Sequence, residues 1–433
     1  MNEKPNIFKD KKILIYGLGK TGISAFNFLK KDNDISLFDD VSNLNLNKIL
    51  RKKLKSITQI QKKQFDIIIL SPGIDINKCK LKKFLKTNQK KIYTDLDIFF
   101  SNFKNLCITI TGTNGKSTTC QLLYEVFKKQ GLDVKLTGNI GYPILSTKNI
   151  KQKTIFIIEA SSYQLEYSKL FNSKFAAILN IAQDHLERHK NLNNYISAKF
   201  KIIKNQKKNY LAFINKYDSY SNNNIKKNNY KSKIIYVNTK LNKKFLKNFK
   251  NEYLLSTSNI QNLSFVIEIS KKFKIKRSTL FDVVKRFKGL KYRQQIIFKN
   301  KNLTIINDSK STSYSSSIET LKRRKNIYWL LGGIPKKGDK FKLSKFYCKN
   351  IKGFIFGKNY KKFSLDLKNK IQYKKYSNLK NALNDLLKEI NKDNSVEKNI
   401  LFSPAAASFD SFKNFENRGF YFNKLIRKNF NVR

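Results

Sequence analysis

The segment GTNGKST at residues 112–118 constrains the fold of this chain more than any other feature. It follows an apolar run at residues 106–111 that predicts a buried strand, and it precedes a run whose apolar residues fall on one helical face. A strand, a glycine-rich turn and a helix N-terminus form a phosphate-binding cradle, because backbone N–H groups point inward and the helix dipole favours negative charge. Lys116 can reach the outer phosphates of a nucleotide, and the Ser117 hydroxyl can hold Mg²⁺. Ile110 stands where the full G-x-x-x-x-G-K-[ST] pattern has its first glycine, so a plain turn before a helix is the alternative.

The chain carries 89 Lys and Arg residues against 30 Asp and Glu residues, a net charge of +59. Such a charge would suit a nucleic-acid partner. However, the lysines are spread along the whole chain among many Asn, Ile, Phe and Tyr residues, and no basic block alternates with aromatic residues as in an RNA-binding motif. We therefore interpret the charge as a compositional bias of AT-rich codons and expect no nucleic acid as the main partner.

The length of 433 residues predicts two to four domains. The four cysteines form no CxxC pair and are scattered along the chain. Scattered thiols in a chain of this length are typical of proteins from a reducing compartment. No apolar run approaches the ~20 residues that a membrane helix needs, and the first residues have no apolar signal core. We expect a cytoplasmic monomer that does not bind membranes.

The first 94 residues contain a second glycine-rich turn, GLGKTG at residues 17–22, between a predicted strand and a predicted helix. The next strand ends at Asp39 and Asp40, so the segment matches the G-x-G-x-x-G fingerprint with an acid about twenty residues beyond it. A further strand ends in Ser-Pro-Gly at residues 71–73. The pattern predicts a Rossmann-like domain for a nucleotide diphosphate, and it does not distinguish nicotinamide from other nucleotides.

The second block, residues 95–289, contains the phosphate loop and two more predicted strands. One strand ends at Glu159 and the other at Asp184 and His185. In open α/β sheets ligands bind beyond the carboxyl ends of the strands, so we expect these side chains near the phosphate loop. A carboxylate and an imidazole beside a triphosphate indicate metal and phosphoryl chemistry. His185 and His189 are the only histidines in the chain; a capping Asp and a surface His are the alternative.

The roles of three other polar residues of this block cannot be decided from residue type alone. Lys199 lies on a predicted helix, and for one lysine among many a solvated helix face is the default interpretation. Asn259 and Asn262 open an apolar helix, either as N-cap and polar neighbour or as amide contacts to a nucleotide.

The third block, residues 290–433, has three predicted strands that also end in polar or glycine-rich turns. These turns lie at Asp308 to Lys310, at residues 332–333 and at residues 403–404. After the last of them we expect a helix with Ser408 near its start.

Phe409, Phe412 and Phe415 recur at helical spacing in that last segment. Aromatic residues at this spacing more often form the core face of a helix than a ligand contact.

Together these motifs resemble the Mur ligases of peptidoglycan synthesis. The resemblance rests on GTNGKST, Glu159, residues 180–185, Lys199, NDSKST at residues 307–312 and SPAAASFDSFKNFENRG at residues 403–419. It runs in order from about Lys11 to Gly419, and the tail motif and GLGKTG favour the branch of the family that adds D-glutamate.

The resemblance implies a three-domain α/β fold. A Rossmann-like domain at residues 1–94 would bind the uridine diphosphate of the substrate, a central P-loop domain at residues 95–289 would bind ATP, and a C-terminal Rossmann-like domain at residues 290–433 would bind the amino acid. The implied reaction is the ATP-dependent, ADP-forming ligation of D-glutamate to UDP-N-acetylmuramoyl-L-alanine through an acyl phosphate.

The resemblance also implies roles for particular residues. The catalytic residues would be Lys116, Asn139, His185 and Lys199, the last carbamylated. Two Mg²⁺ sites would use Ser117, Glu159, His185 and Lys199. ATP would contact Gly112, Thr113, Asn114, Gly115, Lys116, Ser117, Thr118, Asn262, Arg293 and Asp308. The other substrates would contact Gly19, Thr21, Asp39, Ser71, Gly73, Asn139, Lys310, Thr312, Lys336, Ser408 and Phe415.

The sequence departs from the family pattern in two places. Ser258 and Tyr292 stand where histidines are usual, before Asn259 and Arg293 respectively. In the variable loop after the second strand of the third block, Lys337 is an alternative to Lys336.

Three other functions compete with this interpretation. A folylpolyglutamate synthase would not need the dinucleotide-like first domain. An NAD-dependent oxidoreductase would leave the phosphate loop unexplained. A P-loop nucleic-acid motor would account for the charge, and its ATP turnover would depend on nucleic acid and not on D-glutamate.

Overall fold

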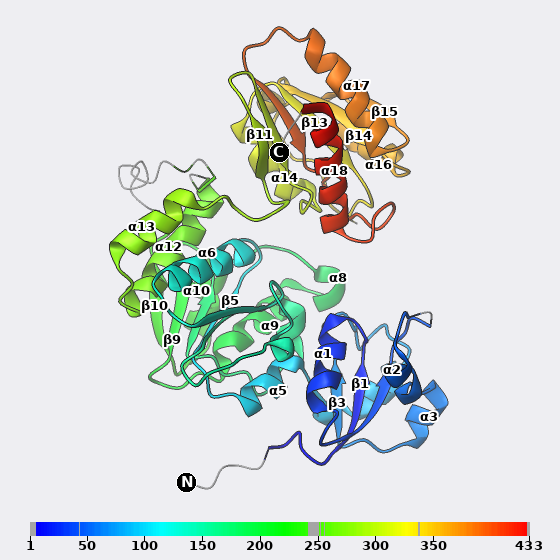
Figure 1. The fold of residues 1–433 in the computed structure, drawn as a ribbon, viewed down its shortest axis with the longest axis vertical. Coiled ribbons are helices and arrows are strands. Elements are labelled where there is room, and N and C mark those ends of the chain that lie inside the picture. The colour runs from blue at the N-terminus through cyan, green and yellow to red at the C-terminus, as the bar shows by residue number, and fades with distance from the viewer. Residues whose placement is uncertain are drawn as a thin grey trace. The chain divides into compact units, whose positions relative to one another are not determined.

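The computed structural model describes residues 6–430 except 43, 241–250, 252, 255 and 337, and of Glu319 only the backbone. The chain divides into two compact units, Met1–Phe287 and Lys288–Arg433. The first unit contains two sheets and the second contains one, and helices pack against each sheet (Figure 1). The α/β class with three sheets built mainly of parallel strands is as predicted. The predicted domain division between residues 94 and 95 stays a prediction, because one compact unit includes both sides of it.

The first sheet has four parallel strands in the order β2-β1-β3-β4. The strands are β1 (Lys12–Tyr16), β2 (Asp34–Phe38), β3 (Ile67–Leu70) and β4 (Ile92–Tyr93). Its helices are α1 (Lys20–Leu29), α2 (Lys48–Lys53), α3 (Ile57–Lys62) and α4 (Lys82–Thr87). The strands are apolar on both faces, as in Ile13, Leu14 and Ile15, because helices cover both sides of a parallel sheet.

The second sheet has six parallel strands in the order β10-β9-β8-β5-β7-β6. They are β5 (Cys107–Thr111), β6 (Val134–Gly138), β7 (Ile155–Glu159), β8 (Phe175–Ile178), β9 (Leu211–Asn215) and β10 (Lys233–Val237). The helices are α5 (Asp95–Asn102), α6 (Lys116–Lys129), α7 (Ser162–Glu166), α8 (Leu186–His189), α9 (Leu192–Lys204), α10 (Ser219–Lys227), α12 (Thr257–Lys272) and α13 (Arg277–Arg286). Helices α6, α12 and α13 share one hydrophobic core, and α5 and α9 share another. Strand β5 lies between β7 and β8, so the three predicted site segments leave neighbouring strands at one edge of the sheet.

The third sheet has six strands in the order β11-β12-β16-β13-β14-β15. They are β11 (Gln295–Lys299), β12 (Leu303–Asn307), β13 (Ile327–Gly332), β14 (Ile351–Phe356), β15 (Gln372–Tyr376) and β16 (Lys398–Phe402). Only β11 is antiparallel to its neighbour. The helices are α14 (Tyr314–Arg323), α15 (Lys345–Cys348), α16 (Tyr360–Leu367), α17 (Leu379–Lys392) and α18 (Phe415–Phe430).

The prediction of a helix that starts near Ser408 is wrong. Residues 408–414 form turns, in which the Ser408 carbonyl accepts hydrogen bonds from the N–H groups of Ser411 and Phe412. Helix α18 starts later because the Asn414 side chain accepts the N–H of Asn417 (2.8 Å), as a capping residue does. Phe409 is consequently 72% exposed and does not belong to the core.

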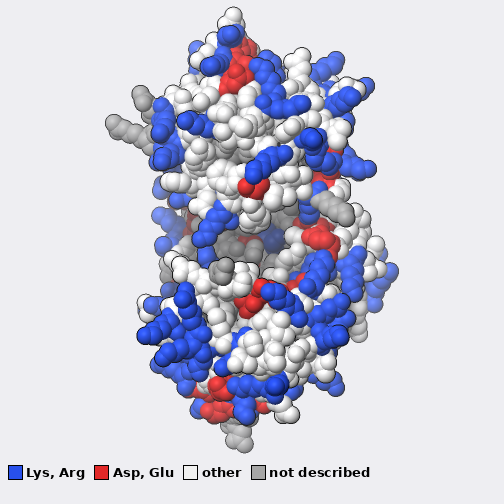
Figure 2. All heavy atoms as spheres, turned by 90° about the vertical axis from the view of Figure 1, so that its right-hand side faces the viewer, with Lys and Arg blue, Asp and Glu red and all other residues white. Residues whose placement is uncertain are grey.

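Three general properties of the chain are visible in the structure. No helix of the described residues is both long enough and apolar enough to cross a lipid bilayer. On the face drawn in Figure 2, Lys and Arg side chains are scattered over the surface and do not gather in one patch. All four cysteines are free thiols and are buried.

Candidate active site

The phosphate loop joins strand β5 to helix α6 and is held on two sides. The N–H of Thr113 donates to the Asn180 carbonyl (2.9 Å), and the N–H of Asn114 donates to the Asn180 side chain (2.9 Å). On the other side, a Cβ atom added to Gly115 would lie 2.0 Å from Oδ1 of Asn262. Gly115 also has φ of +85°, so both its conformation and its neighbour require glycine.

Helix α12 presents Asn262 to this loop. Ser256 is its N-cap and accepts the N–H of Asn259 (3.1 Å), so Asn259 is not the capping residue. Instead, the side-chain oxygen of Asn259 accepts a hydrogen bond from Nδ2 of Asn262 (3.1 Å). The pair is buried, and Asn259 thereby orients the amide that faces Gly115.

Two lysine side chains converge on the same backbone carbonyl of the loop. Nζ of Lys116 donates to the carbonyls of Gly112 and Thr113, both at 2.9 Å. Nζ of Lys199, which comes from α9, donates to the Gly112 carbonyl at 2.7 Å. Lys199 is only 1% exposed, so the default interpretation of a solvated lysine is wrong.

Burial places the pKa of Lys199 well below that of an ordinary lysine. The positive charge of Lys116 lowers this pKa further, whereas the carboxylates of Asp184 and Glu159 raise it. The loss of hydration dominates because the amine lies in the protein interior. These charge effects also show that Lys116, Asp184 and Glu159 lie close enough to Lys199 to act on its ionisation.

Glu159 provides a carboxylate oxygen that has no hydrogen-bond partner among the residues that the structure describes. Its Oε1 accepts a hydrogen bond from Nδ2 of Asn139 (2.7 Å), while Oε2 is buried without a hydrogen-bond partner. Such an orphaned oxygen is costly unless a ligand engages it. Ser117 and Thr118 are buried in the first turn of α6. An anionic oxygen and a hydroxyl fit the oxygen ligands that Mg²⁺ prefers, although no group of three or more His, Cys, Asp or Glu among the described residues could hold a metal ion.

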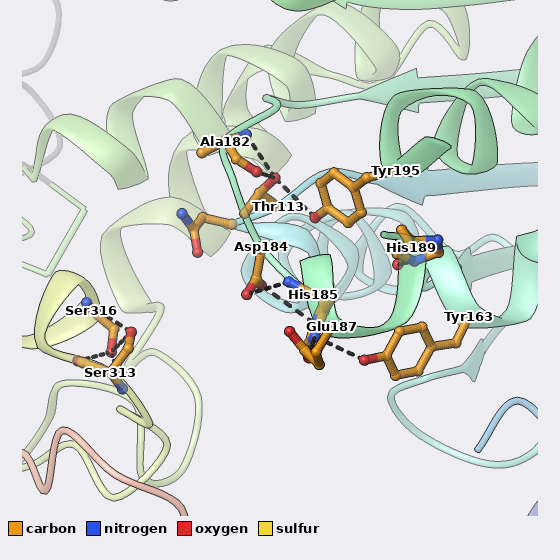
Figure 3. Close-up of polar contacts among 12 residues, drawn as sticks. Thr113, Tyr163, Ala182, Asp184, His185, Glu187, His189, Tyr195, Ser313 and Ser316 are labelled. Atoms are coloured by element: carbon orange, nitrogen blue, oxygen red, sulfur yellow. Dashed lines mark hydrogen bonds and ion pairs between the residues drawn. The ribbon is translucent and has the colours of Figure 1, made fainter. Parts of the chain in front are cut away.

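The two histidines have different environments (Figure 3). The ring of His185 is partly exposed, with Nδ1 3.0 Å from the Tyr163 hydroxyl and Nε2 3.3 Å from Oδ2 of Asp184. His189 is 3% exposed, and its Nε2 pairs with the Ser162 hydroxyl (3.0 Å). Burial lowers the pKa of His189 to about 4, so it is neutral and structural. Of the two, only His185 remains a candidate ligand.

The glycine-rich turn of the first sheet is closed by side chains that were predicted to bind substrate. Oδ2 of Asp39 accepts the N–H of Leu18 (2.6 Å), and the Ser71 hydroxyl donates to the Gly17 carbonyl (2.7 Å). A Cβ atom on Gly17 would lie 2.6 Å from the Cβ of Ser71. Asp39 and Ser71 therefore shape the turn itself. The other predicted residues of this region are exposed or half-buried, namely Gly19, Thr21 and Gly73.

Helix α8 connects this turn region to the phosphate-loop sheet. Arg188 is buried, and its guanidinium donates to the Ile74 carbonyl (2.7 Å) and to Oε2 of Glu166 (2.8 Å). Nζ of Lys78 donates to the Glu187 carbonyl (3.1 Å). The segment that carries His185 is thus fixed to the loop after β3.

In the second unit, Asp308 is a buried acid. It accepts hydrogen bonds from the N–H of Gln294 (3.1 Å) and the Ser403 hydroxyl (3.0 Å). Burial raises the pKa of Asp308 to about 7, although these hydrogen bonds and Arg293 oppose the shift. The structure places Asp308 and Arg293 close enough to interact, and their predicted contact with ATP stays a prediction.

Two residues predicted to bind the amino acid, Lys310 and Phe415, contact each other in this unit. Nζ of Lys310 lies 4.2 Å from the centre of the Phe415 ring, a cation–π contact. Ser408 is buried in the turn that follows β16. Phe415, predicted as a core residue of a helix, is the first residue of α18 and contacts Lys310.

The remaining predicted positions lie near the surface. Thr312 is exposed and Lys336 is half-buried, whereas Lys337 lies outside the described residues. Tyr292, which departs from the family pattern, packs its ring so closely on Gly419 that an added Cβ would lie 2.4 Å away.

Sequence analysis missed Arg418, which holds together the strand-end loops of the third sheet. The side chain is fully buried, and its Nη2 donates to the carbonyls of Ser309 (2.7 Å) and Ala406 (2.9 Å). Its Nε and Nη1 reach the Ser309 hydroxyl (3.2 Å) and the Gly332 carbonyl (3.4 Å). Its place within the SPAAAS…NRG motif was a signal, but one arginine among so many basic residues did not stand out.

The fold and the site define a class. A parallel sheet with a phosphate loop, a buried lysine and an orphaned carboxylate at its carboxyl edge is typical of α/β enzymes that use nucleoside triphosphates. Residues 110–278 match the Mur ligase middle domain, and residues 11–92 match the Mur ligase MurD-like N-terminal domain. This chain belongs to the Mur ligase family.

Individual relatives are similar in sequence to this chain over nearly its whole length. The UDP-N-acetylmuramoylalanine–D-glutamate ligase of Rickettsia prowazekii is 35% identical, with 98% of this chain and 99% of the relative covered. That of Buchnera aphidicola subsp. Schizaphis graminum is 36% identical, with coverage of 96% and 98%. The solved UDP-N-acetylmuramate-alanine ligase of Thermotoga maritima matches with a TM-score of 0.56 at 18% identity, covering 97% of this chain and all of that one, which supports the fold.

Proposed function

We propose that this chain is the ATP-dependent ligase that adds D-glutamate to UDP-N-acetylmuramoyl-L-alanine in peptidoglycan synthesis. Full-length similarity to enzymes named for this reaction supports the substrate pair. The observation that carries the proposal is the gathering of Lys116, Lys199 and Glu159 around the phosphate loop.

The first step is transfer of the γ-phosphoryl group of ATP to the alanyl carboxylate, which gives an acyl phosphate and ADP. A carboxylate is a poor electrophile, and its phosphorylation supplies a good leaving group. The contribution of the protein is mainly position and charge. The N–H groups at the start of α6 and the ammonium of Lys116 would bind the phosphates, so Lys116 would exchange its hydrogen bonds to the loop carbonyls for phosphate oxygens.

Divalent cations are part of this proposal. Ser117 and Oε2 of Glu159 would hold one Mg²⁺, and His185 and Lys199 would serve a second. When bound, Mg²⁺ neutralises charge that develops on the phosphoryl oxygens. The lowered pKa of Lys199 favours the neutral amine, the form that can add CO₂ to become a carbamate with ligand oxygens.

The second step is attack of the D-glutamate amine on the acyl carbon, which forms the amide, releases phosphate and loses a proton. D-Glutamate carries two carboxylates, so its pocket needs cationic and hydroxyl donors. Lys310, Lys336, Thr312 and Ser408 would supply them, and Phe415 would hold Lys310 in place. Asp308, Arg293 and Asn262 would contact ATP.

The turn of the first sheet would receive the uridine diphosphate. Gly19, at the N-terminus of α1, has no side chain to obstruct an anion. Thr21, Asp39, Ser71 and Gly73 surround the same turn, where Asp39 and Ser71 act by closing it. We also propose a three-domain division at residues 94/95 and 289/290, a cytoplasmic location, which suits free buried thiols, and a monomeric state.

Phosphate release from ATP tests the proposal. The wild type is mixed with ATP, Mg²⁺ and UDP-N-acetylmuramoyl-L-alanine, and D-glutamate, L-glutamate or neither is added. We expect release only with D-glutamate, together with the ligated product by mass spectrometry. Equal release with both enantiomers, or release that requires folate or nucleic acid, would refute the assignment.

A further inference from the structure

A tyrosine hydroxyl connects the two strand ends that carry the proposed metal ligands. Tyr163 lies on α7, directly after the strand that ends at Glu159, and its hydroxyl is 3.0 Å from Nδ1 of His185 (Figure 3). The two rings lie 4.9 Å apart between centroids.

The ring of His185 needs such a partner. Its side chain is 40% exposed, and its backbone has the uncommon φ of +54° at the start of the short helix α8. Two carboxylates face it: Oδ2 of Asp184 is 3.3 Å from Nε2, and Oε1 of Glu187 is 3.6 Å from Nδ1, beyond hydrogen-bond distance. A partly exposed imidazole with contacts to two acids could flip without a hydrogen bond that fixes one nitrogen.

Tyr163 is itself held firmly. The Arg188 guanidinium lies 5.1 Å from the centre of its ring, and the ring of His189 lies 5.7 Å away. A phenol ordinarily keeps its proton near neutral pH. A phenol can donate to Nδ1 when this nitrogen has a lone pair and accept from it when it carries a proton.

We propose that Tyr163 is a positioning residue that holds the imidazole of His185 with Nδ1 on the phenol and Nε2 turned toward Asp184. This rests on the proposed role of His185 in serving a cation, because partners of the second ring nitrogen fix the orientation and tautomer of ligating histidines. In the free protein, the carboxylate beside Nε2 can only accept, so Nε2 carries the proton. The phenol then donates to Nδ1. A cation on Nε2 would need the lone pair of that nitrogen, so the proton would move to Nδ1 and the phenol oxygen would accept it.

The sequence makes this testable because the chain has only two histidines. Nitrogen-15 NMR of imidazole-labelled protein, at about pH 8.5 where an ordinary histidine is neutral, shows the tautomer of each ring. His189, which pairs with Ser162, is an internal reference. The variants are Tyr163→Phe, which removes one oxygen, and Tyr167→Phe as matched control, since Tyr167 is a half-buried tyrosine of the same segment that also lies against Arg188.

We expect a single Nε2-protonated tautomer for His185 in the wild type and in Tyr167→Phe. In Tyr163→Phe we expect a mixture of tautomers, with the signals of His189 unchanged. Binding of Mn²⁺ alone, followed by its paramagnetic resonance, should weaken about tenfold in Tyr163→Phe and not in Tyr167→Phe.

Two results would overturn the proposal: a wild-type His185 that already populates both tautomers, or identical His185 spectra and Mn²⁺ affinities in wild type and Tyr163→Phe. The spectra are recorded on the free protein, so they remain informative even if no D-glutamate-dependent activity is found. The absence of D-glutamate-dependent activity would refute the proposed function, while the spectra would still establish the orientation of the His185 ring.

Discussion

Replacing Arg418 by methionine should destabilise the second unit of the chain strongly. Methionine retains most of the length of the side chain and removes the guanidinium. Burial lowers the pKa of Arg418 to about 10, but the group still donates four hydrogen bonds to Ser309, Ala406 and Gly332. The substitution would leave buried carbonyl groups in three strand-end loops without this donor.

The size of the effect follows from these contacts. The two short bonds, at 2.7 and 2.9 Å, go to the carbonyls of Ser309 and Ala406, and each buried carbonyl left without a donor costs about 1–3 kcal/mol. The longer bonds add less, and part of the loss is offset because the desolvated charge disappears. We expect the free energy of unfolding to fall by about 3–4 kcal/mol, within the range of about 3–5 kcal/mol for breaking buried charge contacts.

Urea unfolding followed by tryptophan fluorescence measures this loss directly. Trp329 is the only tryptophan of the chain and is fully buried in β13, where its Nε1 donates to the Ser403 carbonyl (2.7 Å). For an m-value of about 2 kcal/mol per M, the urea midpoint should fall by about 1.5–2 M. The control is Arg427→Met, because Arg427 is exposed on the same helix and should shift the midpoint little. If both variants lose less than about 1 kcal/mol, the reasoning about Arg418 is wrong.

Three further predictions concern the first unit. Lys116→Ala should abolish D-glutamate-dependent phosphate release while the circular dichroism spectrum stays that of the wild type; unchanged turnover would contradict the phosphate-loop assignment. Gly115→Ala should weaken ATP binding more than tenfold by calorimetry, since the added Cβ would lie 2.0 Å from an amide oxygen of α12, whereas Gly131→Ala, with nearly the same φ of +86° but open space, should bind ATP normally. Burial raises the pKa of Asp95 to about 7, and its Oδ1 has no partner among the described residues, so stability falls as the pH rises from about 4, where the unfolded chain ionises, to about 7. Asp95→Asn should therefore raise the free energy of unfolding by about 1–3 kcal/mol at pH 8, with the gain fading as the pH falls toward about 4. Asp97→Asn should instead lower the free energy of unfolding, because the Asp97 carboxylate accepts several backbone and hydroxyl hydrogen bonds. If both substitutions changed stability in the same direction, the contrast between these two carboxyl groups would be refuted.

Local sequence patterns were sufficient to predict the strands, turns and helices that carry the candidate site residues of the second sheet. The phosphate loop, the strand that ends at Glu159 and the helix that carries Lys199 lie where apolar periodicity and turn residues placed them. The helix expected at Ser408 was wrong because periodic phenylalanines suggested a core face, while an asparagine six residues later sets the actual helix start.

Roles that depend on contacts between distant segments could not be predicted from local residue patterns, and that of Lys199 was expected only through the resemblance to the Mur ligases. The burial of Lys199 depends on how α9 packs under the loop after β5, so its type and neighbours in sequence suggested only a solvated face. Tyr163 and Arg418 were missed for the same reason: each bonds to groups that are far away in the chain or that belong to unremarkable turns.

The sequence by itself determined the family, the α/β class and the segments predicted to bind phosphate, because these depend on residue order within a strand, a turn and a helix. Only the tertiary structure decided which lysine is buried with a lowered pKa, which carboxylate oxygen lacks a partner among the described residues and which of the two histidines is buried and neutral. Those properties depend on dehydration and on the positions of neighbouring charges, and packing between distant segments fixes both.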